Sequence, residues 1–227
     1  MLLYNYMQSN ALLNEINMTF VHHGTTEYNE QNRVQGSSDI PLSKKGYEDI
    51  EKVVLEHCNY DMYFHSPLMR SEDTLHGILE KYSKHIQNEK IYESPYVTER
   101  GYGIFEGLTP NEIKEQYPSY YDDWLKNENV SGENIESIEH VIERIQEFIE
   151  RCIKYPHANI LVVTHSGFLY ALYKYITGAP LHLKPKDFTI SFPNCCVIDL
   201  QISVYCHYIE FNLKIEDNVI QKIIKHS

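Results

Sequence analysis

The sequence is short of positive charge and has no long apolar run. Lysine and arginine number 20 against 32 aspartate and glutamate residues, which gives a formal net charge of −12. Nucleic-acid binding and adsorption to an anionic membrane surface both require a positive face, so this charge balance argues against either function. No stretch approaches the length of a membrane-spanning helix. We therefore expect no nucleic-acid partner and no membrane partner.

The cysteines suggest neither a disulfide framework nor a zinc site. There are 5 of them, an odd number, and none forms a CxxC pair. The opening residues lack the basic segment and sustained apolar core of a secretory signal. These observations predict a reducing compartment, the cytoplasm.

A linker rich in glycine, serine or proline is also missing. The 227 residues, 42% hydrophobic and 23% charged, are typical of one globular domain that buries a sizeable core. We expect residues 1–15 to form an N-terminal extension and residues 16–227 to form a single α/β domain.

Two apolar segments end abruptly at histidines. Residues 16–21 lead into His22 and His23, and residues 159–164 lead into His165. The patterns predict two strands, the second buried on both faces. Because adjacent strand residues point to opposite faces, one of His22 and His23 could have no chemical role and be only packed in the interior or solvated.

Helical periodicity follows several of the predicted strands. Ser43 is a fitting N-cap for a helix that carries Ile50, Val53 and Val54, with Cys58 as a further candidate, on its apolar face. The spacing from residue 68 onward places Arg70 in the first turn of another helix. Other predicted elements are strands at 60–64, 91–96 and 196–200, a final hairpin at 208–224, and helices at 109–117, ended by Pro118, 138–152 and 169–176.

Four residues at these strand ends and helix starts would suit phosphoryl transfer. A neutral imidazole, His23, can attack phosphorus, and a second, His165, can donate a hydrogen bond to a phosphoryl oxygen. Arg70 offers paired donors to phosphate, and Glu99 in a glycine-rich loop can exchange a proton with the leaving group. This chemistry needs no metal ion, and we expect no cofactor.

Taken in order, these segments resemble the histidine phosphatase superfamily, the phosphoglycerate mutase-like proteins. The matching motifs are His22-His23-Gly24 with Asn29, Ser66-Pro67-Leu68-Met69-Arg70, Glu99-Arg100-Gly101-Tyr102-Gly103, Phe105-Glu106-Gly107 and His165-Ser166-Gly167. The resemblance implies a three-layer α/β/α sandwich of the phosphoglycerate mutase-like kind, here with a C-terminal β-hairpin.

The resemblance also implies roles. His23 would be the phosphorylated nucleophile, Arg70 and His165 would bind the phosphoryl group, and Glu99 would be the proton donor. Glu106 is the alternative acid. The remaining predicted substrate-binding residues are His22, Asn29, Arg100 and Ser166. For Arg100, the alternative interpretation is a solvated loop residue that does not contact substrate.

One position departs from the family pattern, which has arginine where this chain has His22. An unperturbed histidine, with a pKa of about 6.5, is mostly neutral at cytosolic pH and should bind phosphate less well. We expect a metal-independent histidine acid-type phosphatase that hydrolyses a small phosphorylated metabolite through a phosphohistidine, weakened at His22. A phosphoglycerate mutase and a non-catalytic phospho-ligand-binding protein are the alternative functions. Whether two copies of the chain form a homodimer is left open by the sequence.

Overall fold

The computed structural model describes residues 11–57, 59–82, 90–126, 132, 134–183, 191–215 and 219–226. Its described residues form a seven-stranded sheet in the order β3-β2-β4-β1-β5-β6-β7. The strands are β1 Leu12–His22, β2 Met62–His65, β3 Ile91–Glu93, β4 Asn159–Thr164, β5 Val197–Tyr205, β6 Tyr208–Ile215 and β7 Val219–His226. The pairings of β3, β2, β4 and β1 are parallel, and β5, β6 and β7 continue the sheet in antiparallel fashion.

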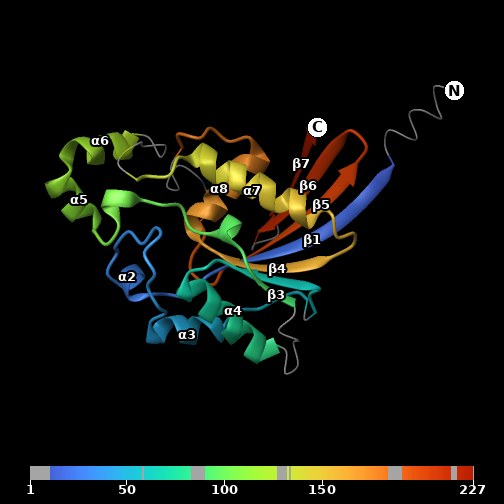
Figure 1. Cartoon of the computed structure of the whole chain (residues 1–227), viewed down its shortest axis with the longest axis horizontal. Helices are drawn as coiled ribbons and strands as arrows, with labels where there is room; N and C mark the ends of the chain where they lie inside the picture. Colours follow the sequence, from blue (N-terminus) through green and yellow to red (C-terminus); the bar gives the residue numbers. More distant parts are fainter. Residues whose placement is uncertain are drawn as a thin grey trace.

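Helices cover both faces of the sheet, with α3 and α4 on one side and α7 and α8 on the other (Figure 1). The helices are α2 Glu27–Glu30, α3 Lys44–Ile50, α4 Met69–Tyr82, α5 Pro110–Gln116, α6 Pro118–Lys126, α7 Ile138–Cys152 and α8 Ser166–Thr177, with 3₁₀ turns η2 Pro95–Val97 and η3 Gly103–Phe105. The predicted three-layer α/β/α sandwich is confirmed. Among the described residues, no helix is both long enough and apolar enough to cross a membrane.

Strand β4 is buried on both of its faces. Ile160 and Val162 belong to the core cluster that includes residues of α7 and α8, whereas Leu161 and Val163 belong to the cluster with residues of α3 and α4. All four are fully buried. Each such side chain stabilises the folded state by roughly 1.5–3 kcal/mol through its removal from water. The continuous apolar run therefore reflects a strand with no water-facing side.

The helix capped by Ser43 is shorter than expected. Ser43 does cap α3, but the helix ends at Ile50, and Val53 then donates its backbone N–H to the Ile50 carbonyl at 3.1 Å. The chain turns at this point, so Val53 is buried and Val54 is 74% exposed. Cys58, the further candidate for the apolar face, lies outside the described residues. The expectation that Val54 lies on the apolar face was wrong.

Three further segments can be compared with their predicted bounds. Helix α5 ends at Gln116 with Tyr117 as its C-cap, so the predicted end before Pro118 is confirmed, and Pro118 also begins α6, because a proline lacks only an N–H that the first turn leaves unpaired in any case. The predicted C-terminal hairpin at 208–224 is confirmed as the antiparallel pair β6 and β7, and β6 also pairs with β5 in antiparallel fashion. Strand β1 already begins at Leu12, within the segment assigned to the N-terminal extension.

Candidate active site

The carboxyl ends of β1, β4 and β2 lie side by side. His22 pairs with Thr164 across β1 and β4, and β2 pairs with β4 on its other side. His23, His165 and Ser66 are the residues that follow the three strands. The ring centroids of His23 and His165 are 5.1 Å apart. In open α/β sheets, ligands collect at this edge.

The imidazole of His23 is held in one tautomer. Its Nδ1 lies 2.7 Å from the Gly24 carbonyl oxygen, which can only accept, so Nδ1 carries the hydrogen. Its Nε2 lies 3.2 Å from Nε of Arg70, which can only donate, so Nε2 holds the lone pair. Burial first, and then the nearby His22 and Arg70, keep the pKa of His23 well below its usual value. A neutral nucleophilic nitrogen therefore faces Arg70.

Arg70 lies in the first turn of α4, as predicted, and is fully buried. Its Nη1 donates to the Ser38 carbonyl at 2.7 Å and its Nη2 donates to the Gly36 carbonyl at 2.8 Å. Together with the bond to His23, these contacts use three of the five guanidinium N–H groups. The other two make no bond among the described residues and suit phosphoryl oxygens.

Glu106 shapes the turn that holds Arg70. Its Oε1 accepts the Ser37 backbone N–H at 2.9 Å and the Tyr102 N–H at 3.0 Å, and its Oε2 accepts the Ser38 hydroxyl at 2.9 Å. Gly36 has a φ of +53°, a conformation that favours glycine. The carboxylate of Glu106 thus holds the turn at residues 36–38 in place.

Glu99 lies at the N-terminus of α8. Its Oε2 accepts the Gly167 N–H and its Oε1 accepts the Phe168 N–H, both at 3.2 Å. A β-carbon at Gly167 would lie 2.4 Å from Glu99 Oε1, so the glycine permits this close approach. Burial raises the pKa of Glu99. A carboxyl group that keeps its proton nearer to neutral pH is suited to acid–base work.

His165 bonds to Ser66 through one ring nitrogen only. The distance from His165 Nε2 to Ser66 Oγ is 2.7 Å. Its Nδ1 is buried and has no hydrogen-bond partner among the described residues. A buried polar atom without a partner is uncommon and points to a ligand that would complete it. Burial, followed by the charge of Arg70, lowers the pKa of His165 well below its usual value.

His22 is buried and turned toward the segment that precedes β5. Its Nδ1 donates to the Phe192 carbonyl at 2.9 Å, and its ring makes a T-shaped contact with the His23 ring at 4.5 Å. Burial lowers the pKa of His22 to about 4. The residue is therefore neutral at neutral pH, and no fixed positive charge stands at this position.

Asn29 lies near the end of β1, next to Asn194. The Asn29 side chain accepts the Thr26 N–H at 3.0 Å within the cap of α2. Asn194 Nδ2 donates to the His23 carbonyl at 2.9 Å and approaches Asn29 Oδ1 at 3.4 Å. The Asn29 amide nitrogen makes no bond among the described residues, so it stays available to a ligand.

Arg100 and Ser166, the other two predicted substrate-binding residues, flank Glu99 and His165. Arg100 is 1% exposed and its Nε donates to the Glu136 carbonyl at 2.7 Å, so it is not a solvated loop residue. Ser166 is the first residue of α8. Their contacts with a substrate stay predictions.

The sequence did not predict the contacts that three other residues make in this site. Ser66 stands in a recognised motif, but its contact with His165 joins positions 99 residues apart. Asn194 follows no pattern. Glu106 was considered only as an acid, because the loop that it holds could not be placed beside it from spacing alone.

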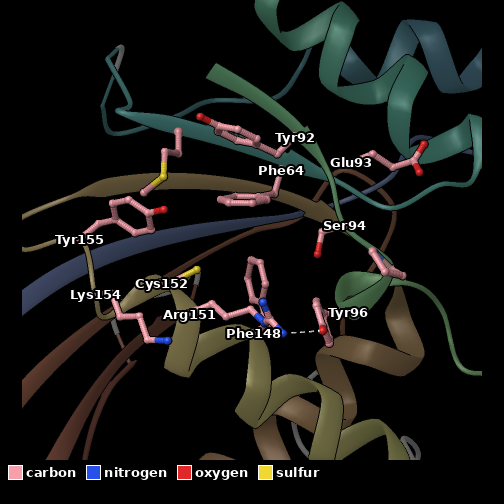
Figure 2. Close-up of a pocket in the computed structure, with 12 residues that line it drawn as sticks. Phe64, Tyr92, Glu93, Ser94, Tyr96, Phe148, Arg151, Cys152, Lys154 and Tyr155 are labelled. Carbon is pink, nitrogen blue, oxygen red and sulfur yellow. Dashed lines mark hydrogen bonds between the residues drawn. The ribbon is translucent and has the colours of Figure 1, made fainter. Parts of the chain in front are cut away.

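A separate cavity of about 450 Å³ lies between the edge of the sheet and α7 (Figure 2). Its aromatic walls include Phe64, Tyr92, Tyr96 and Phe148, and Arg151 donates to the Tyr96 hydroxyl at 2.9 Å. None of the predicted site residues lines it. No group of three or more His, Cys, Asp or Glu side chains in the described part of the chain is arranged to hold a metal ion.

One known family matches the chain along most of its length. The sequence profile of the histidine phosphatase superfamily, branch 1, matches residues 18–210, and the chain belongs to this superfamily. The resemblance expected from the motifs is thus confirmed.

Relatives of the chain include phosphatases and mutases. The uncharacterized phosphatase PhoE of Bacillus subtilis is 27% identical over 186 residues, which cover 81% of this chain and 86% of that protein. The 2,3-bisphosphoglycerate-dependent phosphoglycerate mutase of Cytophaga hutchinsonii is 31% identical over 177 residues, which cover 75% of this chain and 79% of that protein. Bacillus stearothermophilus YhfR, a solved structure, shares the fold with a TM-score of 0.75 and 22% identity, over 90% of this chain and 98% of that one.

Proposed function

We propose that this protein is a metal-independent phosphomonoesterase of the acid-phosphatase type, which hydrolyses a small phosphorylated metabolite through a phosphohistidine at His23. The observation that carries the proposal is the fixed tautomer of His23. Its Nδ1–H is bound by Gly24 and its Nε2 lone pair faces Arg70 at 3.2 Å. A histidine that merely packed in the core would not need an arginine at its free nitrogen.

The reaction would proceed in two displacements. In the first, His23 Nε2 forms a bond to phosphorus while the bond from phosphorus to the leaving oxygen breaks, and Glu99 gives its proton to that oxygen. In the second, a water oxygen attacks the phosphorus, Glu99 takes the water proton, and the N–P bond breaks. Arg70 and His165 bind the phosphoryl oxygens throughout. Atoms and charge balance with water as the only co-substrate.

His22 weakens the phosphate pocket in this proposal. The pocket needs positive charge to hold a phosphomonoester, because the whole chain carries a net charge of −12. With its pKa lowered to about 4, His22 supplies none at neutral pH. Arg70 therefore carries the larger share of phosphate binding, together with the neutral donors of His165 and Asn29.

A phosphoglycerate mutase is the second candidate, because a mutase relative is 31% identical. Incubation with 3-phosphoglycerate and catalytic 2,3-bisphosphoglycerate separates the two. We expect free phosphate, whereas 2-phosphoglycerate without phosphate would identify a mutase. Cytoplasmic action is part of the same proposal, and the free thiols of Cys152 and Cys195 are compatible with a reducing compartment.

The direct test is release of inorganic phosphate from p-nitrophenyl phosphate and a panel of small phosphomonoesters between pH 4 and 8. We expect turnover that His23→Ala abolishes, and an acid-labile phosphoenzyme trapped in the wild type alone. Absence of His23-dependent turnover at every pH would instead support a non-catalytic protein that binds a phosphorylated ligand.

A further inference from the structure

The buried imidazole of His165 can carry its hydrogen on either Nδ1 or Nε2. Its Nε2 lies 2.7 Å from Ser66 Oγ, and its Nδ1 is buried without a partner among the described residues. A neutral imidazole has one N–H and one lone pair. The nitrogen that carries the hydrogen decides whether His165 offers a ligand a donor or an acceptor.

Ser66 decides between the two tautomers. Its side chain is fully buried, and its Oγ already accepts the Leu68 backbone N–H at 3.3 Å. If His165 Nε2 carried the hydrogen, it would donate to the same oxygen, and two buried groups would lack a partner among the described residues, the Ser66 hydroxyl hydrogen and the lone pair of His165 Nδ1. With the hydrogen on Nδ1, only that N–H lacks a partner, and the arrangement with fewer unpaired buried groups is favoured. The Ser66 hydroxyl therefore donates to His165 Nε2, and Nδ1 carries the ring hydrogen.

We propose that Ser66 is a positioning residue that fixes His165 in the Nδ1–H tautomer, so that this free N–H donates to an oxygen of the transferring phosphoryl group. The inference rests on the proposed phosphatase function. The two histidines then have complementary roles, because His23 presents a lone pair and His165 presents a donor, with their ring centroids 5.1 Å apart. The donor stands at the N-terminus of α8, where the helix dipole also favours an anion.

The surroundings of His165 keep its imidazole neutral. Burial, and after it the positive charge of Arg70, opposes protonation of His165. A neutral His165 can donate from Nδ1 only if Nε2 gives up its hydrogen, which is the state that the Ser66 hydroxyl enforces. The hydrogen bond from Ser66 to His165 Nε2 thus determines that His165 Nδ1 carries the hydrogen that a phosphoryl oxygen would accept.

The test uses the full chain and two readouts. Long-range proton–nitrogen correlation spectra of nitrogen-labelled protein at pH 7.5 distinguish the two tautomers, and His165→Asn assigns the signals. We expect the Nδ1–H form in the wild type and in Ser66→Thr, which keeps the hydroxyl, and the Nε2–H form or a mixture in Ser66→Ala. We also expect kcat for p-nitrophenyl phosphate to fall about 10- to 100-fold in Ser66→Ala with KM little changed, since one transition-state donor is impaired.

Several results would overturn the proposal. A wild-type spectrum that shows His165 in the Nε2–H form would by itself refute the proposal, with no need of a variant or an activity measurement. A tautomer that stays unchanged in Ser66→Ala would show that Ser66 does not set it, and a changed tautomer with unchanged kcat would show that the Nδ1–H is not used. A protein with no phosphatase activity at all would refute the proposed function, whereas the spectra would still test the assignment of the Ser66 hydrogen.

Discussion

Gly36 and Glu106 are in such close contact that a β-carbon added at position 36 would lie 2.2 Å from Glu106 Oε1. The carboxylate fills the turn at residues 36–38, and the carbonyls of Gly36 and Ser38 in the same turn bind Arg70. Glu106 therefore acts on the arginine through the turn, and the turn sets the direction in which the guanidinium faces His23.

Replacing Glu106 with glutamine should weaken phosphate binding through Arg70. The amide presents an NH₂ group to the Ser37 and Ser38 hydroxyls and loses hydrogen bonds to a charged group, which are worth about 1.5–3 kcal/mol each. We expect kcat/KM for p-nitrophenyl phosphate to fall about tenfold or more, since about 1.4 kcal/mol corresponds to a factor of ten. Steady-state kinetics measures the change.

Glu112→Gln is the matched control for that variant. Glu112 also accepts several hydrogen bonds, from Thr109 and Arg33, but it makes none to residues 36–38. We expect its effect on kcat/KM to be small. An equal loss in both variants would contradict the connection from Glu106 to Arg70.

The three buried histidines predict that acidification destabilises the fold. His22, His23 and His165 all have lowered pKa values in the folded state, so the unfolded chain binds more protons as the pH falls below about 6.5. His22, with its pKa lowered to about 4, should lower the free energy of unfolding by about 1.4 kcal/mol between pH 7.5 and 5.5, and His23 and His165 should act in the same direction. Urea unfolding at the two pH values measures the sum.

His22→Asn isolates one of these contributions. The raised pKa of Glu99 acts in the opposite direction, because protonation of that group in the folded state adds stability as the pH falls. The difference between wild type and His22→Asn cancels that effect. We expect the variant to lose about 1.4 kcal/mol less than the wild type over the same interval. An identical pH dependence would mean that His22 is not held neutral.

The sequence predicted the strand ends of the site better than the contacts between them. An apolar run that stops at histidine locates the carboxyl end of a buried strand, which placed His23 and His165, and the helical spacing from residue 68 onward placed Arg70. Which strands are neighbours depends on sheet pairing, so the Ser66–His165 bond could not be derived from spacing. The end of α3 was misjudged because Val54 continues the helical pattern although the chain has already turned.

An arginine at position 22 should strengthen phosphate binding by a factor that does not change with pH. His22, with its pKa lowered to about 4, is neutral between pH 5 and 8, so His22→Arg adds a full charge throughout that range. One charge-assisted hydrogen bond to phosphate corresponds to about a tenfold lower KM near neutral pH. The KM for p-nitrophenyl phosphate at four pH values measures the gain.

Val54→Arg controls for the change in net charge, because Val54 is 74% exposed and is not one of the site residues. We expect it to leave KM unchanged. A gain in His22→Arg that disappears below pH 6 would show that His22 titrates near its ordinary pKa, and an unchanged KM would remove His22 from the phosphate pocket.

Glu99→Gln should distinguish substrates by their leaving groups. An alkyl phosphomonoester needs a proton on its leaving oxygen, whereas p-nitrophenolate departs as a stable anion. We expect kcat to fall by about 10²- to 10⁴-fold for alkyl substrates and much less for p-nitrophenyl phosphate. In the wild type, the alkyl activity should decline on the basic side above the ordinary range of a carboxyl pKa, because burial raises the pKa of Glu99. An equal loss with both substrates would mean that Glu99 only holds the N-terminus of α8, through its bonds to Gly167 and Phe168, and the proton donor would have to be sought elsewhere.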